Sequence, residues 1–463
     1  MKYVSTRGSA PALDFAGVTL AGLASDGGLY VPEEWPQFTM DEIAAMRGLP
    51  YAQLAARVMQ PFVGDCLTPE RLLELTEKAY GRFAHAAVTP LTQLDERQWL
   101  LELFHGPTLA FKDVALQLLG LLFEEFLARE EGSLTIVGAT SGDTGSAAID
   151  AVAGLDNVEI FMLHPKGRVS DVQRRQMTTV RAPNVHNIAI DGSFDDAQAM
   201  VKRIFADETV TAKHRIGAVN SINWARLMAQ VVYYFAASLQ LGGPERKLAF
   251  SVPTGNFGDV FAGHVAARMG LPIEQLIVAT NVNDILHRAL SAGDYSTGTV
   301  TPTSAPSMDI QVSSNFERLL YDVGGRDGTA MADQMHAFDA ARAMQLTNAQ
   351  REGASALFTS LRADEDDMAR AMRWACETCA EVVDPHTAIG LHAAREADLP
   401  ADVPVVTLAT AHPAKFPDAV ERATGTRPSL PGRVGDLFAR EEAYTELPGT
   451  YEAVRDHILG NAS

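Results

Sequence analysis

The sequence predicts an α/β protein with two parallel or mixed sheets covered by helices, preceded by a helical N-terminal region. Two observations lead to this fold class. From Leu134 onward, short apolar runs alternate with helix-like stretches, whereas residues 1–90 are mostly helix-like after an irregular opening. Strands that alternate with helices form parallel sheets with both faces covered.

The chain of 463 residues is long enough for two or three domains. We predict a mostly helical region over 1–90, a smaller α/β domain over 91–215 and a larger α/β domain over 216–463. In the first region, Thr68-Pro69-Glu70 favours a helix start, because threonine caps helices and proline is tolerated at the first helical position.

Six apolar runs are predicted strands: 134–137, 158–163, 185–190, 248–252, 276–280 and 405–409. Helix-like stretches follow the first three at 145–153, 170–180 and 194–206, and the long gap before the last strand is largely helical. Ligands of such folds bind at the carboxyl ends of strands, so the turns that follow strands are where chemistry is expected.

Composition limits the classes of partner. The formal charge is −20 and the pI is about 5.0, which argues against nucleic acid because phosphate backbones require clustered cations. The start lacks a signal-peptide pattern and no long apolar run suits a membrane span, so we expect a cytoplasmic protein. Three cysteines make no disulfide framework, and Cys376-Glu-Thr-Cys379 lies in a helix-like stretch, which favours a structural role. No feature indicates an oligomeric state.

The turn over 251–260 follows a predicted strand and opens a helix. Its glycines Gly255 and Gly258 bracket Asn256 and Phe257, and Asp259 follows. Glycines allow main-chain N–H groups to converge, and a helix N-terminus favours an anion. The turn is a candidate phosphate cradle, although a tight turn capped by Asn256 explains it equally well.

A second turn, over 138–148, is rich in hydroxyls. Thr140, Ser141 and Thr144 suit a carboxylate or phosphate, whereas Asp143 would repel an anion. The alternative is a hydroxyl-capped helix start.

The third turn lies in the segment 102–113, in which Lys112 stands near the start of a predicted amphipathic helix. Burial and the helix dipole would both lower the pKa of a lysine there, favouring the neutral amine that forms imines. The alternative is a surface lysine paired with Asp113. Taken together, an imine-forming lysine, a phosphate cradle and a carboxylate loop are what a pyridoxal-phosphate enzyme of amino-acid metabolism requires.

On its motifs the sequence resembles threonine synthase, in the branch found in yeast and many bacteria. The matching segments are 5–8, 25–32, 104–113, 140–145, 220–226, 253–259 and 410–416. The resemblance implies the tryptophan-synthase-β fold type (PLP fold type II) and pyridoxal 5′-phosphate as cofactor. It also implies the conversion of O-phospho-L-homoserine and water into L-threonine and phosphate.

Carried over by position, Lys112 would form the Schiff base and then move the substrate's Cα proton. Residues 255–259 would bind the cofactor phosphate, and Thr410 would give its hydroxyl to the pyridine nitrogen. Thr140, Ser141, Asp143 and Thr144 would bind substrate. Asp143 stands where other branches have Asn. Released phosphate is a candidate for assisting the attack of water, since no protein base is evident.

Several alternatives stay open. Lys415 also follows a strand and rivals Lys112 for the imine. Another lyase of the same fold type, such as an amino-acid dehydratase or a phospholyase, would share the lysine and the cradle, and a non-catalytic binding protein is a third alternative. Lys166 and Arg168 follow the strand 158–163 and are predicted to hold the substrate's phosphate. The histidines show no metal-binding spacing.

Overall fold

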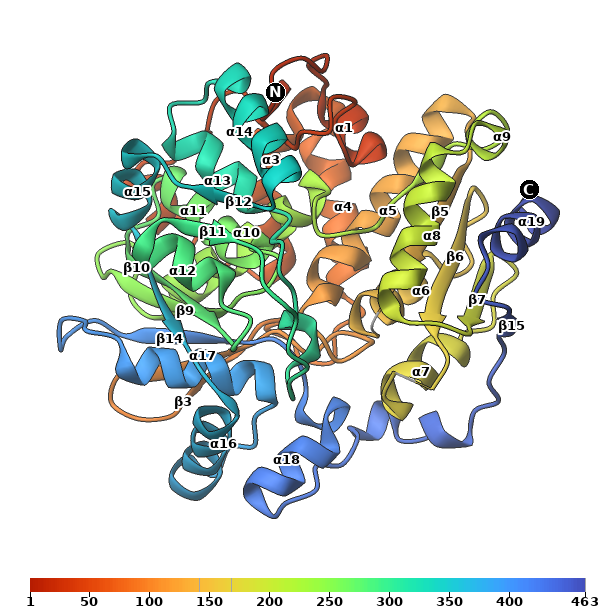
Figure 1. Cartoon of the computed structure of the whole chain (residues 1–463). Helices are drawn as coiled ribbons and strands as arrows, with labels where there is room; N and C mark the ends of the chain where they lie inside the picture. The colour runs from red at the N-terminus through yellow and green to blue at the C-terminus, as the bar shows by residue number, and fades with distance from the viewer. Residues whose placement is uncertain (141, 168, 463) are drawn as a thin grey trace.

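The computed structural model describes residues 1–140, 142–167 and 169–462. Its two main sheets lie side by side in Figure 1, the larger on the left and the smaller on the right, with α4 (Pro69–Tyr80) and α5 (Lys112–Glu130) between them. The predicted α/β class with sheets covered by helices is confirmed.

The larger sheet has the strand order β13-β10-β9-β14-β4-β3. All neighbours are parallel except β3 and β4, which are antiparallel. The strands are β3 (Leu91–Gln93), β4 (Gln98–Glu102), β9 (Leu248–Pro253), β10 (Ile273–Thr280), β13 (Phe358–Arg362) and β14 (Val405–Ala409). Strands β9 and β14 are buried throughout, as expected of apolar runs inside a covered parallel sheet.

The smaller sheet is entirely parallel and has the order β15-β7-β6-β5-β8. The strands are β5 (Leu134–Ala139), β6 (Val158–Pro165), β7 (Val185–Ile190), β8 (Ile216–Gly217) and β15 (Thr445–Leu447). The chain returns to this sheet at its C-terminal end, where β15 and α19 (Tyr451–Asn461) lie at the right of Figure 1.

Helices and two small strand pairs account for the remaining regular structure. In the N-terminal part these are β1 (Tyr3–Ser5), β2 (Tyr30–Pro32), α1 (Phe15–Ala21), α2 (Met40–Ala44) and α3 (Tyr51–Val63). Around the smaller sheet are α6 (Asp143–Val152), α7 (Asp171–Thr178), α8 (Phe194–Ala206) and α9 (Glu208–Thr211). The larger sheet is accompanied by α10 (Trp224–Gln240), α11 (Gly258–Arg268), α12 (Ile285–Ala292), β11 (Asp294–Ser296), α13 (Phe316–Val323), α14 (Gly328–Ala341), β12 (Ala343–Gln345), α15 (Asn348–Ser355), α16 (Glu365–Cys379), α17 (Pro385–Glu396) and α18 (Pro417–Thr424).

All six predicted strands are present, and the predicted helix after Thr68 is α4, capped by the Thr68 hydroxyl. The sequence did not indicate β13, which lies in the long gap predicted to be largely helical, or the short strands β8 and β15. None of the helices in the described part of the chain has the length and apolar character needed to traverse a bilayer.

The predicted region boundaries at residues 90 and 215 do not coincide with the two sheets, and they differ from them in two respects. Strands β3 and β4 belong to the larger sheet because β4 pairs with β14, and β15 joins the smaller sheet from the end of the chain. The three regions remain a prediction.

Candidate active site

The ends of β4 and β14 bring Lys112 and Thr410 together. The main-chain N–H of Phe111 donates to the carbonyl of Thr410 at 2.8 Å, and Ala110 forms an isolated bridge with Ala411. Lys112 then begins α5. The turn before Lys112 therefore packs against the end of β14, about 300 residues later in the sequence.

Lys112 is almost entirely buried, with 12% of its side chain exposed. Its Nζ lies 3.7 Å from Oδ2 of Asp143 and 4.7 Å from the ring centroid of Phe111. Burial lowers the pKa of Lys112. The charge of Asp143 opposes this, and those of Lys415 and Arg226 add to it. The alternative of a surface lysine paired with Asp113 does not hold, since the Asp113 carboxylate accepts from the N–H and hydroxyl of Thr108.

Lys415, the rival lysine, is fully buried and makes two hydrogen bonds and one ion pair. Its Nζ lies 2.7 Å from the carbonyl of Thr108, 2.7 Å from Oε1 of Gln176 and 3.0 Å from Oδ1 of Asp143. Two of the three donors of its ammonium group make hydrogen bonds, and the charge of Asp143 lies close to the group. Lys415 is therefore bound in place, whereas Lys112 makes no hydrogen bond to any residue that the structure describes and lies at the longer distance from Asp143.

Asp143 lies at the start of α6 between the two lysines. Its Oδ1 also accepts a hydrogen bond from Nε2 of Gln173 at 2.8 Å. Burial alone would raise the pKa of Asp143, but the charges of Lys415 and Lys112 hold it well below its ordinary value. The carboxylate that seemed out of place in an anion-binding loop is thus an ionised partner of Lys415.

The hydroxyl-rich turn is organised by its first threonine. Oγ1 of Thr140 accepts hydrogen bonds from the N–H groups of Gly142 and Gly145, each at 2.9 Å, so its proton remains for another acceptor. Thr144 is half-buried. Ser141 lies outside the described residues. Substrate binding by this turn remains a prediction.

The turn before α11 has the properties of a phosphate cradle. Within the described chain, no residue accepts a hydrogen bond from the main-chain N–H groups of residues 255–258. The carbonyl of Gly255 accepts from Oγ of Ser313 at 2.7 Å, and Phe257 takes the left-handed conformation with φ 63°. Four free donors at a helix N-terminus fit a phosphate group.

Asp259 is held away from solvent by two tyrosines. Its Oδ1 accepts from the hydroxyls of Tyr233 and Tyr234, while Oδ2 has no partner among the described residues. Burial raises the pKa of Asp259 to about 7. The contacts connect the first turn of α11 to α10, and a role in cofactor binding remains a prediction.

Substrate-phosphate binding by Lys166 and Arg168 remains a prediction. Lys166 is half exposed, and its Nζ lies 2.6 Å from Oε2 of Glu446. Arg168 lies outside the described residues.

Sequence reasoning missed Arg226, in the first turn of α10. Its side chain is buried, Nη1 donates to the carbonyl of Val219 at 2.8 Å, and Nε has no hydrogen-bond partner in the described part of the chain. No carboxylate of the described chain forms an ion pair with it, and burial lowers its pKa to about 10. An arginine in the otherwise apolar run 224–229 was the available signal.

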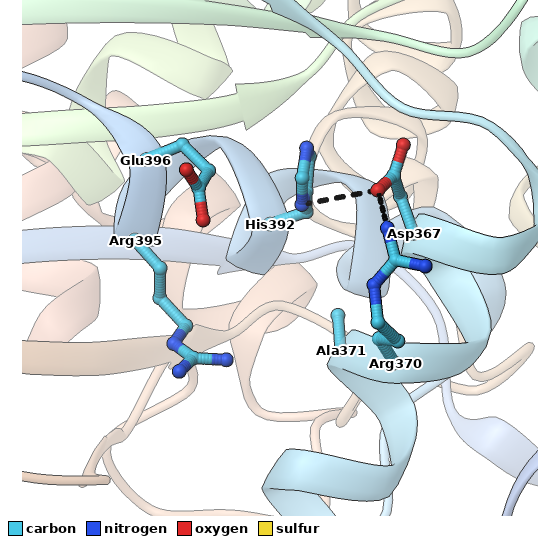
Figure 2. Close-up of a pocket in the computed structure, with 6 residues that line it drawn as sticks. All are labelled: Asp367, Arg370, Ala371, His392, Arg395 and Glu396. Carbon is cyan, nitrogen blue, oxygen red and sulfur yellow. Dashed lines mark hydrogen bonds and ion pairs between the residues drawn. The ribbon is translucent and has the colours of Figure 1, made fainter.

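A separate hollow of about 390 Å³ lies between α16 and α17 (Figure 2). Its lining residues are Asp367, Arg370, Ala371, His392, Arg395 and Glu396. Asp367 contacts both Arg370 and His392. The hollow is at the C-terminal part of α17, whereas Thr387, which contacts Thr410, is in its first turn. It is not part of the site around Lys112.

Comparison with known proteins gives the family. Residues 83–357 match the model of pyridoxal-phosphate dependent enzymes, residues 2–80 the threonine synthase N terminus, and residues 387–458 the threonine synthase C-terminal model. The chain is 56% identical over 459 residues to threonine synthase of Pseudomonas aeruginosa, covering 99% of this chain and 98% of the relative. The chain belongs to the threonine synthase family.

Solved structures agree with this assignment. Pyridoxal-phosphate-bound threonine synthase from Brucella melitensis matches with a TM-score of 0.97 at 50% identity, covering 100% of this chain and 99% of that one. Threonine synthase from yeast matches with a TM-score of 0.94 at 39% identity, covering 99% and 98%. The resemblance stated from the motifs is confirmed, as are PLP fold type II, the lyase class and pyridoxal phosphate as cofactor.

Proposed function

We propose that the protein converts O-phospho-L-homoserine and water into L-threonine and phosphate, with Lys112 as the residue that binds pyridoxal phosphate covalently. The observation that carries this proposal is the contrast between the two buried lysines. Lys415 makes two hydrogen bonds and a 3.0 Å ion pair. Lys112 has a lowered pKa, and its contacts among the described residues are the 3.7 Å approach to Asp143 and the ring of Phe111. A neutral amine is the form that attacks a carbonyl carbon.

The cofactor would be held at two further places. The four free N–H groups of residues 255–258 suit its phosphate, and Thr410, linked to Lys112 through Phe111, suits its ring nitrogen. When bound, pyridoxal phosphate supplies the electron sink that makes protons on the substrate's Cα and Cβ acidic.

Lys112 would move the Cα proton. Its lowered pKa increases the fraction of neutral amine at neutral pH, and a general base works best when its pKa is near the operating pH. Asp143 stays ionised close by and offsets the positive charge that Lys112 acquires on taking the proton. Because Lys415 holds Asp143 at the shorter distance, the carboxylate stays in place while the amine moves.

The substrate's two anionic groups would bind to different residues of the site. The turn over 140–144 suits the α-carboxylate, with Thr140, Ser141 and Thr144 as hydroxyl donors. We propose Arg226 for the phosphate, because a buried guanidinium without a carboxylate partner is costly unless an anion compensates it. Arginine also binds phosphate bidentately. Lys166 and Arg168 stand as the second candidates.

The test combines product analysis with two variants. Purified protein loaded with pyridoxal phosphate should release phosphate and threonine from O-phospho-L-homoserine, and failure to do so would overturn the function. Arg226→Met should raise KM for this substrate about tenfold to a hundredfold, the effect of losing one hydrogen bond to a charged group. Lys166→Met is the matched control, and a larger effect there would move the phosphate to the loop 164–170.

We also propose a cytoplasmic location. All three cysteines are free thiols in the structure, which suits a reducing compartment.

A further inference from the structure

Asp384 precedes α17 and is completely buried. Its carboxylate accepts four hydrogen bonds: from the N–H of His386 at 3.0 Å, the N–H of Thr387 at 3.1 Å, Nδ1 of His386 at 2.7 Å and the hydroxyl of Thr387. The two oxygens of a carboxylate accept about four hydrogen bonds in all. Capping a helix needs only the main-chain pair, so the two side-chain contacts require another explanation.

The contact with Thr387 leads to the end of β14. Because the hydroxyl of Thr387 donates to Asp384, its lone pairs face outward, and they accept from the N–H of Thr410 at 3.3 Å. The carbonyl of Thr410 in turn accepts from the N–H of Phe111, the residue before Lys112. A continuous series of hydrogen bonds thus joins Asp384 to the start of α5.

The contact with His386 leads to the phosphate cradle. The main-chain N–H of Ser307 lies 3.3 Å from Nε2 of His386. An amide N–H can only donate, so Nε2 must accept and the ring proton must reside on Nδ1, directed at Asp384. The segment around Ser307 packs closely on Gly255. A Cβ added to Gly255 would lie 3.1 Å from the carbonyl oxygen of Ser307.

We propose that Asp384 is a positioning residue for the cofactor site. Through His386 it holds the segment of Ser307 against the cradle, and through Thr387 it holds Thr410 beside Lys112. The buried carboxylate of Asp384 therefore fixes the distance between the phosphate cradle and Thr410, the two proposed contacts of pyridoxal phosphate. The inference rests on the proposed roles of Gly255 and Thr410 as cofactor contacts.

Asp384→Asn tests the inference on the full-length protein. An amide accepts at only one of its two ends, so its NH₂ group would face the donors of either Thr387 or His386. In the first case the hydroxyl of Thr387 loses its acceptor. In the second, His386 would have to shift its proton to Nε2, opposite the N–H of Ser307. We expect the dissociation constant of pyridoxal phosphate to rise about tenfold or more and the visible absorption of the bound cofactor to change. Borohydride should still fix the cofactor to Lys112, and labelling elsewhere would refute the proposed function instead.

The matched control is Asp364→Asn. Asp364 caps α16 by accepting from the N–H of Asp367 at 2.9 Å, but it is exposed and makes no hydrogen bond or ion pair with the described residues of the site. Both variants should lower the melting temperature, whereas only Asp384→Asn should weaken cofactor binding. Equal cofactor affinity and spectra in the two variants would show that Asp384 is a helix cap alone.

Variants of Thr387 provide a second test, which remains informative if the Asp384→Asn protein does not fold. Thr387→Val removes the hydroxyl with little change in shape, and Thr387→Ser restores it. We expect the altered absorption and weaker cofactor binding in the valine variant and wild-type behaviour in the serine variant. If valine and serine behave alike, the hydroxyl does not position Thr410 and the inference fails.

Discussion

Gly255→Val is the sharpest test of the phosphate cradle. A Cβ at this position would lie 3.1 Å from the carbonyl oxygen of Ser307 and 3.3 Å from Cα of Met308, both main-chain atoms. The turn cannot easily rotate away, because Oγ of Ser313 holds the carbonyl of Gly255 at 2.7 Å. The larger valine side chain must therefore displace the turn and the N–H groups that follow it.

The expected loss follows from the hydrogen bonds at risk. Each hydrogen bond to a charged group contributes roughly 1.5–3 kcal/mol, so losing one should weaken cofactor binding about tenfold to a hundredfold. The assay is an absorbance titration of the cofactor-free protein with pyridoxal phosphate. Gly432→Val is the matched control, because Gly432 is exposed and a Cβ there meets no atom within 4 Å. A folded Gly255→Val protein with wild-type affinity would place the phosphate elsewhere.

Three further predictions concern buried charges. Borohydride reduction and peptide mapping should find the cofactor on Lys112, and label on Lys415 would contradict the assignment. Lys415→Ala should lower the free energy of unfolding by about 3–5 kcal/mol, because it leaves Asp143 ionised and buried without its nearer cation. The cofactor should still label Lys112. An unchanged free energy of unfolding in denaturant would show that the ion pair between Lys415 and Asp143 does not stabilise the fold. Asp259→Asn should gain stability relative to wild type as pH rises. The raised pKa of Asp259 means that the folded protein keeps a proton that the unfolded chain releases, so wild-type stability falls between about pH 4 and its pKa of about 7. The slope is about 1.4 kcal/mol per pH unit for one group, and identical pH profiles of the two cofactor-free proteins would refute the shift.

The sequence by itself determined the local features. Alternation of apolar runs and helix-like stretches was enough for the fold class and for six strands, because burial on both faces of a parallel sheet requires continuous apolar residues. The position of Lys112 at a helix start and the glycines around Asn256 are likewise set within a few residues. The motifs were long enough to indicate the family.

The tertiary structure decided which strands pair. The sequence grouped β4 with the strands that follow it, but β4 lies between β3 and β14. Strand β15, near the C-terminal end of the chain, pairs with β7. Parallel pairing joins segments far apart in sequence, and three-residue strands such as β15 are too short for a period to be recognised.

The charge partners were also decided only in three dimensions. Asp143 seemed to oppose anion binding until Lys415, from the far end of the chain, was found 3.0 Å away. The sequence assigned no role to Arg226, whose burial without a carboxylate partner among the described residues is evident only in the folded chain. The physical reason is common to both: the free energy of a buried charge depends on the groups that surround it in the folded protein, and sequence spacing does not specify those groups.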